Sequence, residues 1–279
     1  MATIDAGSAT GRMLIYRHSL AVRLSHWLNV LCMTVLLFSG LQIFNAHPAL
    51  YWGQYGADHD PSFISMEAVE DGGRARGLTH IGPLTFDTTG FLGLSEVDGE
   101  ADARAFPDWL TIPSYQDLAT GRRWHFFFAW LFVINGLAYL AYGLISRHFR
   151  RDLVPAGDEL TPAHLGHEVV NHARLRFPKG PEARHYNTLQ KLTYLAVIFL
   201  LLPLMILTGL TMSPGFNAVA PWLLDVFGGR QSARTLHFLT AFSLVAFVAV
   251  HLAMVLLSGV FNNLRSMITG YYAIEAEDK

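Results

Sequence analysis

The chain has 279 residues, of which 52% are hydrophobic and only 15% are charged. Charged residues make up about a quarter of a soluble domain, so the composition indicates a membrane protein. The formal net charge of −2 gives no support to a nucleic-acid-binding function. The single cysteine, Cys32, excludes an internal disulfide, a Cys-x-x-Cys-His attachment site and a cysteine-ligated iron–sulfur cluster within the chain. Any metal must therefore depend on histidine, of which there are thirteen.

Four long apolar segments predict membrane-spanning helices, because a helix needs about 20 apolar residues to cross a bilayer. They run roughly over Leu24–Phe44, His125–Ser146, Leu189–Met212 and Thr235–Phe261. The first is interpreted as an uncleaved helix, since its apolar run from about Trp27 is too long for a signal peptide and no small-residue cleavage site follows. We therefore predict an all-α fold, an integral-membrane four-helix bundle forming one domain over residues 1–279.

The connections between these helices differ in charge. Residues 45–121, here called the insert, contain twelve acidic and only three basic residues. The segment before the first helix has three arginines and one acid, and the connection over about residues 147–186 has seven basic residues. Basic residues remain on the cytoplasmic side of a membrane. Both termini are therefore predicted to be cytoplasmic and the insert periplasmic, in a bacterial inner membrane.

The insert is also much longer than a helix–helix connection requires. Its glycine, proline and aromatic residues predict a folded cap instead of a loose linker. Two interpretations of this cap remain open: an addition specific to the family, and a docking surface for an external partner.

Four histidines lie on the predicted helices at depths that match in pairs. A histidine inside a membrane is costly unless it faces the protein interior and has a partner. His237 and His251 are fourteen residues apart, so they share one face of the fourth helix, about 21 Å apart along its axis. His125 matches the depth of His237, and His26 matches that of His251. These positions predict two non-covalent b-type haems, each held by two histidines.

An arginine stands three residues before three of these histidines, in the pairs Arg23 and His26, Arg122 and His125, and Arg234 and His237. In each pair the arginine lies one turn closer to the membrane surface on the same helix face. A guanidinium there is placed to bind a haem propionate through two hydrogen bonds. Arginines at helix ends are also common for interfacial reasons alone, but the threefold repetition favours haem.

His185 is the main competitor of His26 as a haem ligand. The first and third helices share a landmark near their predicted outer ends, Ser39-Gly40-Leu41 and Thr208-Gly209-Leu210. His26 lies fourteen residues before its glycine, whereas His185 lies twenty-four before its own. If both glycines lie at one depth, His185 is about 15 Å further toward the cytoplasm. We therefore predict His26 as the ligand.

With these residues in place, the chain resembles the bacterial di-haem cytochrome b family, which includes the membrane subunits of formate dehydrogenases and nickel–iron hydrogenases. The matching segments are Arg23-Leu-Ser-His26-Trp27 with Ser39-Gly40-Leu41, Arg122-Arg-Trp-His125, Tyr186-Asn187-Thr-Leu-Gln190-Lys191, and His237 with His251. The resemblance covers all four helices but not the insert. It implies haem ligands from the first, second and fourth helices and a quinone site near the cytoplasmic-side haem, with Asn187 and Gln190 as candidate quinone contacts.

The resemblance implies an electron-transfer subunit of an oxidoreductase complex, working between a periplasmic redox partner and membrane quinone. The long insert and the segment Pro113-Ser-Tyr-Gln-Asp-Leu118 are similar to cytochrome b subunits that accompany periplasmic molybdopterin oxidoreductases. One alternative is a stand-alone enzyme that oxidises a small reductant such as superoxide. Another is a haem-free transporter or scaffold, which leaves the three arginine–histidine pairs unexplained. A homo-oligomer is compatible with the sequence.

Overall fold

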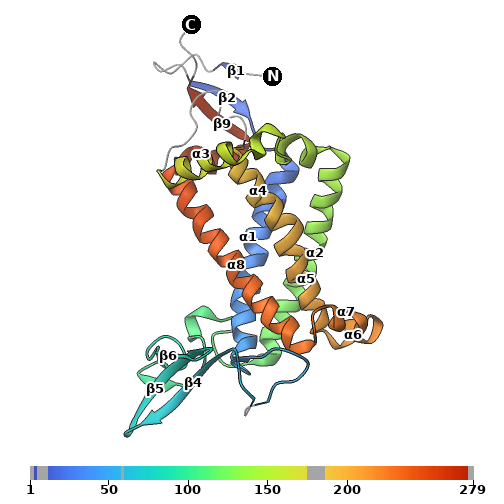
Figure 1. Ribbon diagram of the computed structural model, residues 1–279. Coiled ribbons are helices and arrows are strands. Elements are labelled where there is room, and N and C mark those ends of the chain that lie inside the picture. The colour runs from blue at the N-terminus through green and yellow to red at the C-terminus, as the bar shows by residue number, and fades with distance from the viewer. Residues whose placement is uncertain (1–2, 5–11, 58–59, 175–185, 276–279) are drawn as a thin grey trace. The chain divides into compact units, whose positions relative to one another are not determined.

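The computed structural model describes residues 3–4, 12–57, 60–174 and 186–275 (Figure 1). The chain divides into two compact units, which are described separately below. Unit 1 comprises Met1–Leu28, Asn135–Pro203 and Ser243–Lys279, and unit 2 comprises Asn29–Ile134 and Leu204–Phe242. His185 lies outside the described residues.

Four helical spans are long and apolar enough to cross a membrane, which confirms the predicted bundle. They are α1 (Leu20–Phe44), α2 (Leu118–Ile145), a composite span over Thr188–Thr211, and α8 (Arg230–Leu257). All four spans begin before the predicted first residue, α1 by four residues, α2 by seven, the third span by one and α8 by five. The early residues include arginines, which are good helix formers, so helical hydrogen bonding continues past the point where the apolar pattern stops.

The third span is not a regular helix. It consists of α4 (Thr188–Ala196), a π-helical turn over Val197–Leu201, and α5 (Leu202–Thr211). Pro203 explains the irregular turn, because proline donates no backbone hydrogen bond and its ring clashes with the carbonyl four residues earlier. Membrane helices tolerate such a break where neighbouring groups satisfy the freed carbonyls.

Unit 1 also contains short elements outside the long helical spans. A three-stranded antiparallel sheet has the order β1–β2–β9, from Thr3–Ile4, Arg12–Tyr16 and Tyr271–Glu275. Strands near the two chain ends therefore pair with each other. The remaining elements of this unit are α9 (Val260–Thr269), α3 (Pro162–Ala173), a π turn over Phe149–Leu153 and a 3₁₀ turn over Asp158–Leu160.

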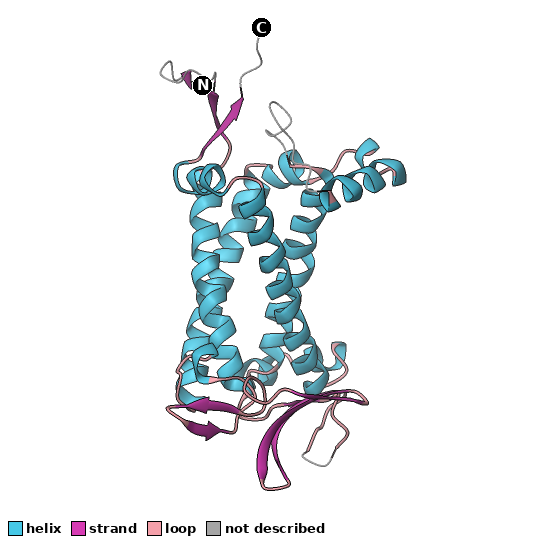
Figure 2. Cartoon of the chain, turned by 90° about the vertical axis from the view of Figure 1, so that its left-hand side faces the viewer, coloured by secondary structure: helices cyan, strands magenta, loops and turns pink. Residues whose placement is uncertain are grey.

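In unit 2 the insert is folded, but as β-structure. Its strands are β3 (Ala49–Leu50), β4 (Ile64–Asp71), β5 (Arg74–Ile81) and β6 (Leu84–Asp87) in one antiparallel sheet, and β7 (Ser95–Val97) with β8 (Glu100–Asp102) in a second. Figure 2 shows these strands in magenta where α1 ends and α2 begins. A 3₁₀ turn over Asp108–Leu110 belongs to the insert, and α6 (Pro214–Val219) and α7 (Trp222–Val226) lie between α5 and α8.

The insert is attached to the end of α1 by an apolar core. This core consists of Leu41, Phe44, Leu50, Ile64, Met66, Ala105 and Phe106. The Asn45 side chain adds a double polar contact: its Oδ1 accepts from the Phe106 amide at 2.8 Å and its Nδ2 donates to the Phe106 carbonyl at 3.0 Å. The insert is therefore fixed to the helix that precedes it.

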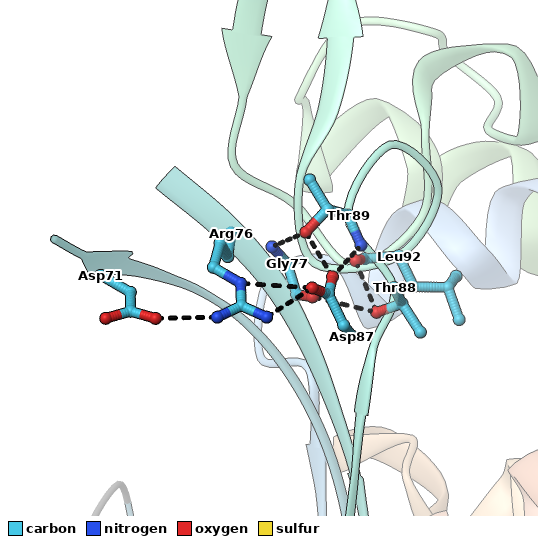
Figure 3. Close-up of polar contacts among 7 residues, drawn as sticks. All are labelled: Asp71, Arg76, Gly77, Asp87, Thr88, Thr89 and Leu92. Atoms are coloured by element: carbon cyan, nitrogen blue, oxygen red, sulfur yellow. Dashed lines mark hydrogen bonds and ion pairs between the residues drawn. The ribbon is translucent and has the colours of Figure 1, made fainter. Parts of the chain in front are cut away.

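A polar network connects β4, β5, β6 and the turn that follows β6 in the four-stranded sheet (Figure 3). Arg76 on β5 donates to Asp87 at 2.6 Å and to Asp71 at 2.8 Å. The Thr89 hydroxyl donates to Asp87 at 2.6 Å and accepts from the Gly77 amide at 3.0 Å. The hydrogen bond from Thr89, followed by that from Arg76, holds the pKa of Asp87 well below its usual range.

Candidate functional site

The first candidate site lies in unit 2, where α2 and α8 each contribute one histidine. The ring centroids of His125 and His237 are 6.3 Å apart. A metal–histidine bond is about 2 Å long and the ring centre lies roughly 1 Å behind the bonding nitrogen, so two axial histidines on one metal have centroids about 6 Å apart. The pair therefore has the spacing of two imidazoles that face one metal ion.

Hydrogen bonds at the opposite ring nitrogen orient both histidines. His125 Nδ1 lies 3.1 Å from Ser39 Oγ and 3.1 Å from the Leu36 carbonyl oxygen. His237 Nδ1 lies 3.1 Å from Thr208 Oγ1 and also bonds the Met205 backbone. In both cases the backbone partner lies three residues before the hydroxyl residue: Leu36 before Ser39, and Met205 before Thr208. Each ring is thus held by one turn of a neighbouring helix.

These contacts assign the proton of each ring. A carbonyl oxygen only accepts hydrogen bonds, so the nitrogen facing Leu36 must carry a proton. The Ser39 hydroxyl donates its one proton to the Val35 carbonyl at 2.6 Å, and Thr208 donates to the Leu204 carbonyl at 2.6 Å. Toward the histidines both hydroxyls therefore accept. The protonated nitrogen is Nδ1, which leaves the Nε2 lone pair available to a metal.

A glycine next to each hydroxyl residue allows this close approach. A methyl group on Gly40 would lie 3.3 Å from His125 Cε1, and one on Gly209 would lie 3.2 Å from His237 Cε1. Both distances are shorter than ordinary van der Waals contact. The hydroxyl–glycine–leucine triplets, which the sequence analysis used only as depth markers, therefore contact the two candidate ligands.

The second candidate site lies in unit 1, between α1 and α8. The ring centroids of His26 and His251 are also 6.3 Å apart. Trp27 packs edge-on against His26 at 5.3 Å and Phe247 stacks on His251 at 6.0 Å. The Nδ1 atom of His26 is buried and has no hydrogen-bond partner among the described residues. This pair repeats the spacing of the first pair without the hydroxyl contact.

The donor set fits haem. Within the described ranges no group of three or more His, Cys, Asp or Glu side chains is placed to hold a metal ion directly. Two histidines on opposite sides of a metal suit an iron whose four remaining ligands come from a porphyrin. The spacing of both pairs agrees with that requirement.

The three arginines that precede the histidines have different surroundings. Arg23 donates from Nη1 to the Ile268 carbonyl, and its buried Nε has no partner among the described residues. Arg122 is exposed and its guanidinium lies 5.4 Å from the ring centroid of Phe126. Arg234 donates to the His47 and Ala49 carbonyls, so it connects α8 to the first residues of the insert.

Asn187 and Gln190 form the capping box of α4. Asn187 Oδ1 accepts from the Gln190 amide at 2.8 Å, and Gln190 Oε1 accepts from the Asn187 amide at 3.3 Å. Their side chains therefore stabilise the start of α4. They were predicted as quinone contacts, and the cap is a role that the sequence analysis missed, although the Asn-x-x-Gln spacing is itself a capping signal.

Next to this cap lies a small polar cluster around the buried His18 side chain. Tyr186 Oη is 3.4 Å from His18 Nδ1, and the Arg17 guanidinium lies 5.6 Å from the Tyr186 ring centroid. Burial, with a smaller contribution from Arg17, lowers the pKa of His18 to about 4. Burial also raises the pKa of Tyr186. Both side chains are consequently neutral at physiological pH and able to hydrogen-bond a neutral ligand.

Comparisons with known proteins identify the family of the chain. The family model described as prokaryotic cytochrome b561 matches residues 17–270. A similar curated protein is the putative protein-methionine-sulfoxide reductase subunit YedZ1 of Azospira oryzae, 28% identical over 253 residues, which are 90% of this chain and 94% of the relative. No solved structure matches the chain with significance. The resemblance to the bacterial cytochrome b family is confirmed: the chain belongs to the prokaryotic cytochrome b561 family of membrane haem proteins.

Proposed function

We propose that this cytochrome is the electron-transfer subunit of an oxidoreductase complex and binds two b-type haems, one at each histidine pair. The supporting observation is the identical 6.3 Å spacing of the His125–His237 and His26–His251 pairs, in separate units of one chain. When bound, b-type haem supplies reversible one-electron chemistry at its iron. The helix α8 contributes one histidine to each pair.

The protein's own residues orient the ligands and neutralise charge. Ser39 and Thr208 hold the ligand rings of the His125–His237 site through Nδ1. Arg23 and Arg122 remain the candidates for propionate binding, because each has donors that the described contacts do not use. Arg234 is the weaker candidate, since backbone carbonyls of the insert already accept from it.

We propose that the insert is periplasmic, that the termini are cytoplasmic and that the protein resides in the inner membrane. The acidic insert and the basic segments around it support this orientation. A catalytic subunit then docks on the insert side and takes electrons that originate from quinol on the cytoplasmic side. The name of the YedZ1 relative suggests a methionine-sulfoxide reductase as that partner.

The stoichiometry of that partner reaction is consistent with quinol as the donor. A sulfoxide takes up two electrons and two protons to give a thioether and water, and one quinol releases both pairs when it becomes a quinone. The quinone site is proposed beside the start of α4, where Tyr186 and His18 provide neutral hydrogen-bonding groups. Asn187 and Gln190 contribute there by fixing the helix start.

The function is tested by a dithionite-reduced minus oxidised visible spectrum with haem quantified per chain. We expect two non-covalent b haems in the wild type and one or fewer in His237→Ala and in His251→Ala. His167→Ala is the matched control, because His167 is exposed on α3 and belongs to neither pair. A well-folded wild type that binds no haem, when expressed with ample haem, would contradict the proposal, and one haem per chain would contradict the pairing.

A further inference from the structure

The two ligands of the His125–His237 pair are held by the same local structure, taken from two different helices. On α1, Ser39 donates to the carbonyl four residues earlier and accepts from a histidine Nδ1, and Gly40 contacts that ring. On α5, Thr208 and Gly209 do the same for the other histidine. Both hydroxyl residues are 0% exposed. We name each hydroxyl–glycine pair a histidine clamp.

Among the described residues, no hydroxyl group hydrogen-bonds His26 in this way. His26 Nδ1 is buried with no hydrogen-bond partner among the described residues. Its ring is contacted by the indole of Trp27 and lies opposite His251. The two candidate haem sites are therefore alike in spacing but different in how their ligands are oriented.

We propose that Ser39 and Thr208 are a matched pair of positioning residues, which fix the Nδ1–H tautomer and the ring orientation of both ligands at one haem only. This inference rests on the proposed function, since it assumes that haem binds at His125 and His237. The Nδ1–H group of each ring lies between a hydroxyl acceptor and a carbonyl acceptor. Rotation of the ring would therefore break at least one of these two contacts. This restricts the directions in which the two Nε2 lone pairs can point.

The physical consequence is an asymmetry in how firmly the two haems are held. Loss of a hydrogen bond to the non-coordinating nitrogen of a ligand histidine lowers metal affinity by about 10- to 100-fold. The remaining carbonyl acceptors, Leu36 and Met205, keep some of the orientation, so the lower end of that range applies. The effect belongs to the His125–His237 site, and the other site is unaffected.

The test measures the rate at which haem leaves the purified wild type and its variants for an excess of apomyoglobin. In the wild type we expect two phases, and the phase missing from His125→Ala identifies the clamped site. Ser39→Ala and Thr208→Val are each expected to accelerate that same phase by about tenfold and to leave the other phase unchanged. A low-temperature electron paramagnetic resonance spectrum should also show a broader low-spin signal for that haem, because the rings are free to adopt several orientations.

Two variants serve as controls. Thr208→Ser retains the hydroxyl and is expected to lose haem at the wild-type rate. Thr211→Val removes a second buried hydroxyl on α5, which donates to the Thr208 carbonyl at 2.6 Å, and this variant is expected to change neither phase. If Ser39→Ala does not fold, the three Thr208 and Thr211 variants complete the test.

Unchanged haem loss from both clamp variants would overturn the inference while leaving the proposed function intact. Equal acceleration of both phases would also overturn it, because the effect would then be general destabilisation. Absence of haem from the wild type is a different result, which would contradict the proposed function itself.

Discussion

The hydrogen bonds of individual ring nitrogens determine which nitrogen of His125 and of His237 is available to a metal ion. The Nδ1 contacts of His125 and His237 place the proton on the ring nitrogen that faces the neighbouring helix. The other nitrogen is thereby left with its lone pair. Neither fact follows from the positions of the histidines alone, because each depends on a carbonyl or hydroxyl contributed by a distant part of the chain.

The glycine of each clamp gives a prediction at this scale. Gly209→Ala would place a methyl group 3.2 Å from His237 Cε1, which forces the ring or the helix to move by a few tenths of an ångström. Overpacking of this kind costs about 1–3 kcal/mol. We expect Gly209→Ala to lose haem from the His125–His237 site, as measured by haem per chain and by the reduced spectrum.

Gly136→Ala is the control for that variant. Gly136 lies within α2, and a methyl group there would meet no heavy atom within 4 Å. Its haem content should equal that of the wild type. Normal haem content in Gly209→Ala would mean that the ring tolerates the displacement and that the close approach has no role in ligand binding.

At the scale of elements, the insert shows how polar contacts define a small sheet. Arg76, Asp87 and Thr89 connect β5, β6 and the turn that follows them. The depressed pKa of Asp87 means that its carboxylate stabilises the folded insert above the unfolded pKa of about 4. This contribution is lost progressively as the pH falls from that value toward the lower pKa of Asp87 in the folded insert.

The corresponding prediction concerns acid sensitivity. Hydrogen exchange of the β5–β6 amides should stay constant from pH 7 to about pH 5, after correction for the intrinsic rate, and should accelerate below about pH 4. Asp87→Asn should exchange faster already at pH 7 and show little further change on acidification. A wild-type insert whose corrected exchange is insensitive to acid would show that Asp87 does not stabilise the sheet.

For the whole molecule, the proposed function depends on the orientation of the chain in the membrane. Single cysteines labelled with a membrane-impermeant maleimide in intact cells test it. Tyr55→Cys in the insert, 83% exposed, is expected to react from outside, whereas His167→Cys on α3 should react only after lysis. The native Cys32 is 0% exposed and gives the background.

The reverse labelling pattern would place the insert in the cytoplasm. It would also reverse the proposed assignment of partner and quinone sides. Labelling of both positions in intact cells would indicate a leaky preparation, which the wild-type background and a cytoplasmic marker protein reveal.

Sequence by itself determined the membrane class, the number of spans and the family. A membrane helix satisfies its backbone hydrogen bonds within its own segment, so hydropathy and length are enough to find it. The spacing of His237 and His251 within one helix is likewise a local property, and it led directly to the cytochrome b resemblance.

Only the tertiary structure decided the features that depend on contacts between distant residues. The strands of the insert, the pairing of β2 with β9 and the carbonyl partners of Arg234 all join segments whose proximity no local pattern encodes. The Asn187–Gln190 cap was readable locally, but the family resemblance suggested a different role for it. The histidine clamps depend on both kinds of information. The hydroxyl–glycine–leucine triplets can be read from the sequence. The histidines that they contact are known only from the packing of α1 against α2 and of α5 against α8.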